Sequence, residues 1–173
     1  MPSGDLRANI VLCRMKEVTL ELRLQVYASA DQAPPPLGAL LQEAKTAMES
    51  AYAPYSKFRV GAAVLLENGA VVRGSNQENA SFPEGLCAER VALFAAGAQH
   101  PGIPAVAIAV IADKLDEGWV SPCGGCRQVM LETETRSGKP LSVVLTNLSG
   151  QVGVVSSAAT LLPWCFDGHL LFH

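Results

Sequence analysis

Hydrophobic and polar residues alternate without interruption over residues 18–26, VTLELRLQV. Alternation with a period of two places every apolar side chain on one face, so this segment predicts a β-strand. The Pro-rich stretch that follows, ending at Pro36, breaks the pattern. Residues 1–36 are therefore interpreted as an extension of the domain, with three alternatives open: it adds an edge strand, pairs with another subunit or stays mobile.

The apolar pattern changes after the proline stretch. Over residues 37–52, apolar residues recur at helical spacing, which predicts an amphipathic helix. The apolar run at 60–66 predicts a buried strand, and the Glu-Asn-Gly turn at 67–69 predicts a hairpin into a partner strand at 70–76. The continuous apolar run at 105–112 is typical of a central strand that is buried on both faces.

The rest of the chain continues this mixture of strands and helices. Two further helices are expected to begin near Cys87 and near Cys123 or Gly124. The later predicted elements are strands at 141–147 and 151–155 and a short helix at 157–164. Strands and helices mixed in this way predict one layered α/β domain, which we place at residues 37–173.

Composition narrows the class of protein. The chain has 173 residues, of which 49% are hydrophobic and 17% charged, as is typical of a globular domain. A net charge of −3 and 6% aromatic residues argue against a channel for a nucleic acid polymer. No apolar run approaches the roughly 20 residues of a membrane helix. Five cysteines, an odd number without a secretory leader, do not suggest a disulfide framework, so we expect a reducing, cytoplasmic compartment.

Three of the cysteines stand in two short motifs, LCAERVAL at 86–93 and SPCGGCRQ at 121–128. Cys87 and Cys123 each precede a predicted helix, where unpaired backbone N–H groups and the helix dipole stabilise thiolates. Three thiolates can hold one Zn²⁺ and leave the fourth tetrahedral position to water, as in catalytic zinc sites. On its own, the Cys-x-x-Cys pair completed by Cys126 is also compatible with a redox pair or half of a structural zinc site. Cys13 and Cys165 lack ligand spacing and are interpreted as ordinary thiols.

Charged residues flank these cysteines. Glu89 follows Cys87 by two positions, where its carboxylate can take a proton from a bound water and return it to a leaving nitrogen. The alternative is a helix N-terminal glutamate that interacts with the dipole. Arg90 lies one helical turn from Cys87, and Arg127 adjoins Cys126. Either arginine can draw charge off the sulfurs, and the alternative for each is an ordinary surface or ion-pair residue.

The combination of Cys-x-Glu with Pro-Cys-x-x-Cys resembles the zinc nucleoside and nucleobase deaminases. Three further stretches are similar to the small, homotetrameric cytidine deaminases: YSKFRVGAAV at 55–64, NQENASFPEG at 76–85 and LLPWCF at 161–166. The resemblance extends over most of the chain after the extension. It implies a three-layer α/β/α sandwich with a mixed five-stranded sheet, and a homotetramer with shared active sites.

The resemblance also implies roles for individual residues. One zinc ion per chain would be held by Cys87, Cys123 and Cys126, and Glu89 would move the proton. The substrate contacts would be Phe58 against the pyrimidine, the backbone of Ala88 and Ser121 at its polar edge, Asn76 and Glu78 at the ribose hydroxyls, and Tyr55 and Phe166 near a site shared between subunits. An amide and a carboxylate suit a ribose, whose two hydroxyls both donate and accept hydrogen bonds.

The implied reaction is hydrolytic deamination of cytidine, deoxycytidine or both, releasing ammonia, in pyrimidine salvage. A deaminase of a nucleoside antibiotic of the blasticidin type shares the zinc motifs, although NQEN and FPEG favour cytidine. A non-catalytic, zinc-stabilised interaction domain would need a fourth ligand, and no further cysteine or histidine has ligand spacing. Arg59, Trp164 and Cys165 differ from the residues that are usual in this family. The shape of the pocket shared between subunits is therefore not predicted.

Overall fold

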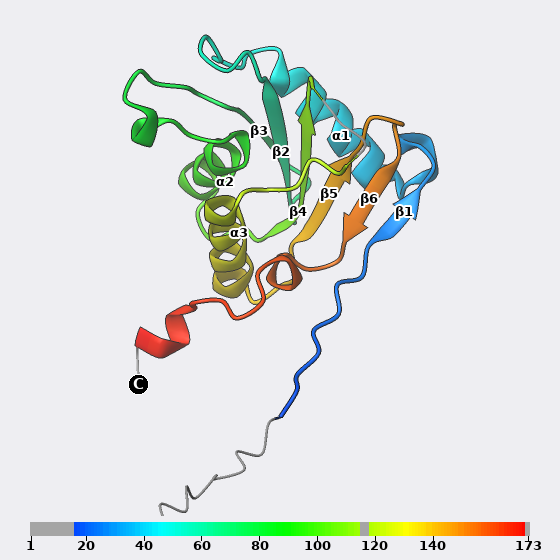
Figure 1. The fold of residues 1–173 in the computed structure, drawn as a ribbon, viewed down its shortest axis with the longest axis vertical. Helices are drawn as coiled ribbons and strands as arrows, with labels where there is room; N and C mark the ends of the chain where they lie inside the picture. Colours follow the sequence, from blue (N-terminus) through cyan, green and yellow to red (C-terminus); the bar gives the residue numbers. More distant parts are fainter. Residues whose placement is uncertain (1–15, 115–117, 172–173) are drawn as a thin grey trace, which may run out of the picture.

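A mixed sheet of six strands forms the centre of the computed structural model, which describes residues 16–114 and 118–171 (Figure 1). The strand order is β1-β6-β5-β4-β2-β3. The neighbours β4 and β5 run parallel, and the other neighbouring pairs run antiparallel. In chain order the strands are β1 (Gln25–Tyr27), β2 (Val60–Leu66), β3 (Val71–Ser75), β4 (Ala105–Ala112), β5 (Ser142–Thr146) and β6 (Val152–Val155).

Helices cover both faces of this sheet (Figure 1). Helix α1 (Pro35–Met48) packs on one face, and α2 (Ala88–Gln99) and α3 (Gly124–Ser137) pack on the other. The fold is therefore the predicted three-layer α/β/α sandwich. The described residues also form four short 3-10 helices: η1 (Ala30–Gln32), η2 (Phe82–Glu84), η3 (Ala158–Leu161) and η4 (Gly168–Leu171). Within residues 16–114 and 118–171, none of the helices is long and apolar enough to cross a membrane.

Strand β4 has the predicted bounds and lies inside the sheet, between β5 and β2. Its side chains belong alternately to two cores. Ile108 and Val110 are buried under α2 and α3, whereas Ala107 and Ala109 are buried under α1. Burial on both faces explains why this strand reads as a continuous apolar run instead of an alternating one.

The sheet has six strands rather than five because a short part of the N-terminal segment joins its edge. The predicted strand over residues 18–26 is wrong in length, since β1 contains only three residues, paired antiparallel with β6. The apolar residues Val18, Leu20 and Leu22 before it are 55%, 57% and 56% exposed. Alternation determines which side chains share a face, but a strand also requires a neighbouring backbone to bond with. The extension before residue 16, with Cys13, lies outside the described residues.

Two predicted helices differ from the observed ones at their ends. Helix α1 begins at Pro35, inside the stretch that was expected to break the chain, and it ends at Met48. Proline is compatible with the first turn of a helix because the N–H that it lacks has no partner there. The closing helix predicted at 157–164 is reduced to the single 3-10 turn η3, which spans Ala158–Leu161.

A glycine on β2 allows α1 to approach the sheet closely. A Cβ atom at Gly61 would overlap the carbonyl oxygen of Ala44 and lie 2.5 Å from the backbone nitrogen of Met48. Backbone atoms cannot rotate away, so we expect Gly61→Ala to lower the free energy of unfolding by about 1–3 kcal/mol.

The control for this prediction is Gly97→Ala, on α2. A Cβ atom at Gly97 would meet only side-chain atoms of Arg136, at 3.5 Å or more, and alanine favours a helix more than glycine does. Denaturant unfolding should therefore show Gly97→Ala to be at least as stable as the wild type. Equal losses of stability in both variants would contradict the packing argument.

Candidate active site

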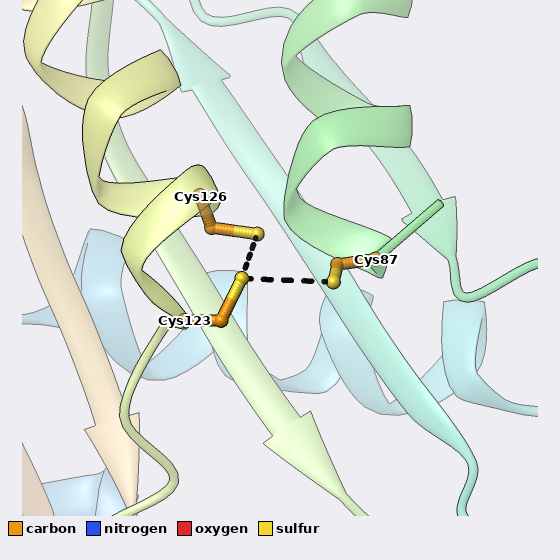
Figure 2. Close-up of side chains that lie close together, drawn as sticks. All are labelled: Cys87, Cys123 and Cys126. Carbon is orange, nitrogen blue, oxygen red and sulfur yellow. Dashed lines mark hydrogen bonds between the residues drawn. The ribbon is translucent and has the colours of Figure 1, made fainter. Parts of the chain in front are cut away.

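Three thiols from the starts of two helices converge on one point (Figure 2). Cys87 is the N-cap residue of α2, Cys123 is the N-cap residue of α3, and Cys126 lies in the first turn of α3. The three Sγ atoms lie within 4.8 Å of one another, with 3.9 Å between Cys87 and Cys123 and 3.4 Å between Cys123 and Cys126. Thiolates at this separation can bind a single tetrahedral ion such as Zn²⁺, so the cluster is a candidate metal site.

The order of the elements explains why the thiols meet. Helix α2 follows β3, α3 follows β4, and the two helices lie on the same face of the sheet. Cys123 and Cys126 are three residues apart, a spacing that places two side chains on one side of a helical turn. The Cys-x-x-Cys motif therefore presents two sulfurs from α3, and Cys87 adds the third from α2.

The surroundings of the cluster favour a thiolate at Cys87. Its pKa is lowered to about 5, first by the hydrogen bond with the Cys126 side chain and then by Arg90, whose Nη2 lies 3.9 Å from the Cys87 sulfur. The same interaction with Cys87, together with burial, raises the pKa of Cys126. Because a thiol must lose its proton to bind a metal, the nearby guanidinium and the helix N-termini favour metal binding.

Glu89 is a buried carboxylic acid in the first turn of α2, only 5% exposed. Burial is the main cause that raises its pKa above the ordinary value, and the negative charge of Cys87 raises it further. A carboxylate with a raised pKa accepts a proton more readily than an ordinary carboxylate. The structure therefore places a candidate proton carrier next to the candidate metal site.

A cavity of about 1220 Å³ opens over this cluster. Cys87, Cys123 and Glu89 line it, and so do six of the predicted substrate contacts: Tyr55, Phe58, Asn76, Glu78, Ala88 and Ser121. Phe166 does not belong to its lining within the described part of the chain. Its ring is on the surface, with 58% of the residue exposed, and its carbonyl oxygen accepts a hydrogen bond from Gln128 at 2.9 Å.

Asn76 shapes the loop that carries Phe58. Its Oδ1 accepts a hydrogen bond from the N–H of Val60 at 2.8 Å, and its Nδ2 donates to the carbonyl oxygen of Phe58 at 2.8 Å. A side-chain amide has two donor hydrogens and two acceptor lone pairs, so these bonds use half of its capacity. Asn76 can therefore hold the loop and still bind a polar ligand group in the cavity.

Glu78 fixes the start of the same loop. Its carboxylate accepts hydrogen bonds from the N–H groups of Tyr55, at 2.9 Å, and Ser56, at 3.3 Å, and from the hydroxyl of Ser56. The bond from that hydroxyl is the main cause that lowers the pKa of Glu78. The ring of Tyr55 meets the ring of Phe82 edge to face, with centroids 5.8 Å apart. This wall of the cavity is therefore fixed by contacts within the chain.

Arg127 makes contacts that its position beside Cys126 did not predict. Its guanidinium donates hydrogen bonds to the carbonyl oxygens of Pro122, at 2.8 Å, and Leu161, at 3.1 Å, and to the Ser121 hydroxyl, at 2.7 Å. These bonds join the segment before the Cys-x-x-Cys motif to the 3-10 helix η3. They show Arg127 as a support of the cavity wall, and its effect on the sulfur charges stays a prediction.

Trp119 is a cavity residue that sequence reasoning missed. Its indole lines the cavity and packs over Gly153 of β6, where a Cβ atom would lie 2.9 Å from the ring and 3.0 Å from the side chain of Leu24. Leu24 stands just before β1, so the N-terminal segment contacts the same point of the sheet as the cavity wall. A glycine inside a strand often marks such a close approach, so Gly153 was the sequence feature that could have indicated this contact.

An α/β/α sandwich with three thiols and a buried glutamate at the starts of two helices is the arrangement of the zinc nucleoside and nucleobase deaminases. Comparison with known proteins agrees with this class. Residues 37–138 match the cytidine and deoxycytidylate deaminase zinc-binding region. This match covers more than half of the chain, and the chain belongs to the cytidine deaminase family of hydrolases.

The match to this chain extends over nearly the full length of several similar proteins. The chain is 47% identical over 127 residues to a cytidine deaminase of Halalkalibacterium halodurans, covering 73% of this chain and 91% of the relative. It is 47% identical over 129 residues to a cytidine deaminase of Sporosarcina psychrophila, covering 74% and 89%. A crystal structure of cytidine deaminase from Burkholderia pseudomallei aligns with a TM-score of 0.66 at 50% identity, covering 74% of this chain and 97% of that one.

Proposed function

We propose that this chain removes the amino group of cytidine and deoxycytidine by hydrolysis, forming uridine or deoxyuridine and ammonia. One zinc ion would be held by Cys87, Cys123 and Cys126. The observation that supports this most directly is the buried Glu89 beside three convergent thiols, at a cavity large enough for a nucleoside. The thiols fit zinc in number, chemistry and separation.

The chemical step depends on Glu89. When bound, zinc supplies a water molecule of lowered pKa as the nucleophile for C4 of cytosine. Glu89 would take a proton from this water and give it to the ring nitrogen, and would then take the remaining proton of the hydroxyl formed at C4 and pass it to the departing amine. Burial raises the pKa of Glu89, which brings its proton affinity closer to what both directions of transfer require.

Arg90 compensates for the negative charge of the thiolates. Three thiolate ligands weaken the effect of zinc on a bound water, and the Arg90 guanidinium, 3.9 Å from the Cys87 sulfur, withdraws part of that charge. Its Nη2 also donates to the carbonyl oxygen of Gly85 at 3.3 Å, which holds the side chain beside the cluster.

We assign the substrate contacts to the residues that line the cavity. Phe58 packs against the pyrimidine, and the backbone of Ala88 and Ser121 binds its polar edge. The N–H groups in the first turn of α2 have no partner within the helix, so the backbone at Ala88 is suited to this task. Asn76 and Glu78 bind the ribose hydroxyls with the capacity that their loop contacts leave.

The outer part of the site is proposed to be completed in a homotetramer, by Phe166 and Tyr55 near a neighbouring subunit. Phe166 and Trp164 are 58% and 84% exposed, and such aromatic side chains are typical of surfaces that a partner covers. Trp164 also has a φ angle of +55°, a conformation that favours glycine. The chain therefore makes a tight turn at this residue, which differs from the residue usual in the family. Arg59, the other departure beside Phe58, forms an ion pair with Asp113 at 3.0 Å. A catalytic domain over residues 37–173, a role in pyrimidine salvage and a cytoplasmic location belong to the same proposal.

The proposal is tested by the rates at which the purified protein deaminates cytidine, deoxycytidine and blasticidin S, followed by the loss of the cytosine absorbance. We expect kcat/KM for one or both natural nucleosides to exceed that for the antibiotic. A higher kcat/KM for the antibiotic would instead identify the chain as an antibiotic deaminase. No turnover of any of the three by zinc-loaded protein would refute the proposed function.

The guanidinium of Arg127 donates hydrogen bonds to three groups at once, and we expect the loss of these bonds to change substrate binding. Lysine keeps the charge but cannot bond to Pro122, Ser121 and Leu161 at once. We expect Arg127→Lys to raise KM for cytidine more than it lowers kcat, and to reduce the free energy of unfolding by about 1–3 kcal/mol. Arg136→Lys, at an exposed position on the same helix, is the control. Identical kinetics and stability of the two variants would show that the Arg127 contacts have no such role.

A further inference from the structure

The segment before β1 is an extended arm with one apolar face. Residues 16–24 form no helix or strand; Leu24 packs against β6, and the residues before it run away from the body of the protein (Figure 1). Val18, Leu20 and Leu22 alternate with polar residues along this arm, and each is more than half exposed. A regular row of exposed, branched apolar side chains is unusual on a monomer and marks a surface that a partner covers.

The arm is continuous with a free edge of the sheet. Strand β1 is the outermost strand, paired through Gln25–Tyr27 with β6 on its inner side. Among the described residues, no strand pairs with its outer side. The outer N–H and C=O groups of such an edge are ready to bond with another strand. The polypeptide that fits there must be extended, apolar on alternate residues, and complementary in charge to the arm.

We propose that the occupant is the same segment of a second copy of this chain, paired antiparallel about Leu22. In this register Leu22 lies opposite Leu22 of the second copy, Leu20 lies opposite Leu24, and Val18 lies opposite Val26. All apolar side chains then fall on one face, because opposite residues in an antiparallel pair point the same way. The two sheets become one continuous sheet across a two-fold axis, the symmetry of most homodimeric contacts.

The charges on the other face favour this register over the two neighbouring ones. Pairing about Leu22 places Glu21 of each copy opposite Arg23 of the other, which forms two ion pairs. Pairing about Glu21 would place two carboxylates opposite each other, and pairing about Arg23 would place two guanidinium groups opposite each other. Like charges in directly opposite positions are destabilising. Within one chain Arg23 and Glu21 form an ion pair at 3.0 Å with both side chains at least 70% exposed, so they can exchange partners at little cost.

A cysteine placed on the proposed axis tests the contact. In Leu22→Cys chains, the two new thiols would lie opposite each other, within reach of a short bis-maleimide reagent. In Thr19→Cys chains, the new thiols would be separated by six residue steps, or about 20 Å. We expect covalent dimers from Leu22→Cys above the wild-type background, which accounts for the native cysteines, and none above it from Thr19→Cys. Equal yields from the two variants, or no yield from either, would overturn the proposal.

Charge reversal tests the register in the same assay. With Leu22→Cys in every chain, Glu21→Arg gives an arm with two cations, and Arg23→Glu gives an arm with two anions. Each variant alone opposes like charges at two pairs and is expected to weaken the arm contact about tenfold or more. A mixture of the two opposes only unlike charges, so cross-linking should recover, between one arm of each kind. A mixture that cross-links no better than either variant alone would show that Glu21 and Arg23 do not face each other across the contact.

Discussion

Glu89→Gln is expected to reduce kcat for cytidine deamination by roughly 10²–10⁴-fold, the range typical of a lost general acid–base group. Glutamine matches glutamate in shape but cannot carry the proton from water to the ring nitrogen and the leaving amine. The thiols are untouched, so the zinc content should equal that of the wild type. Glu132→Gln, an exposed change on α3, is the control and should leave kcat unaltered.

The same substitution has a predicted effect on stability with a definite sign. Burial raises the pKa of Glu89 in the folded protein above the ordinary value of 4.5. Above that ordinary value the folded chain therefore retains a proton that the unfolded chain has lost, so stability falls as the pH rises. Glutamine removes this cost. Metal-free Glu89→Gln should be at least as stable as metal-free wild type at neutral pH, and the difference should vanish below the ordinary glutamate pKa. A variant that is active, or that is less stable at neutral pH, would contradict this account of Glu89.

Cys126→Ser is expected to abolish both zinc binding and activity. The Cys126 side chain is fully buried against the other two thiols, and a serine hydroxyl does not ionise to replace the thiolate. Loss of a residue that merely supports a ligand lowers metal affinity by about 10–100-fold, so loss of a ligand itself should exceed the upper end of that range. Competition with a chelator measures this change.

Cys165→Ser provides the matched control for Cys126→Ser. Cys165 is a partly buried thiol that does not belong to the three-cysteine cluster. Its replacement should therefore leave the zinc content and kcat at wild-type values. If Cys126→Ser also retained zinc at wild-type affinity, the assignment of the three thiols as the ligand set would be wrong.

The sequence predicted those strands and helices whose bounds depend mainly on neighbouring residues. The bounds of β2 and β4 follow from apolar runs that end where the chain turns to the surface. The starts of α2 and α3 at Cys87 and Cys123 follow from the motifs, and two helix starts on one face of a sheet are enough to bring the thiols together. These features depend on residues that are close in sequence or on a common order of strands and helices.

Contacts between distant segments account for what the sequence did not predict. Residues 18–24 of the arm have the pattern of a strand, but within the described part of one chain no strand lies beside them to bond with. Arg127 was expected beside the sulfurs, whereas its hydrogen bonds reach Leu161, which lies far along the chain. The packing of Trp119 over Gly153 likewise joins two segments with no shared motif. Pattern and spacing do not specify such pairings, because they arise only when the elements pack.

Removal and return of the metal would show whether this chain is a zinc-dependent cytidine deaminase. Wild-type protein would be depleted with a chelator, assayed with cytidine, and then titrated with zinc while the cytosine absorbance is followed. We expect no turnover by the depleted protein and recovery that reaches its plateau at one zinc ion per chain. Full turnover by protein without zinc, or no turnover of cytidine or deoxycytidine by protein with one zinc ion per chain, would contradict it.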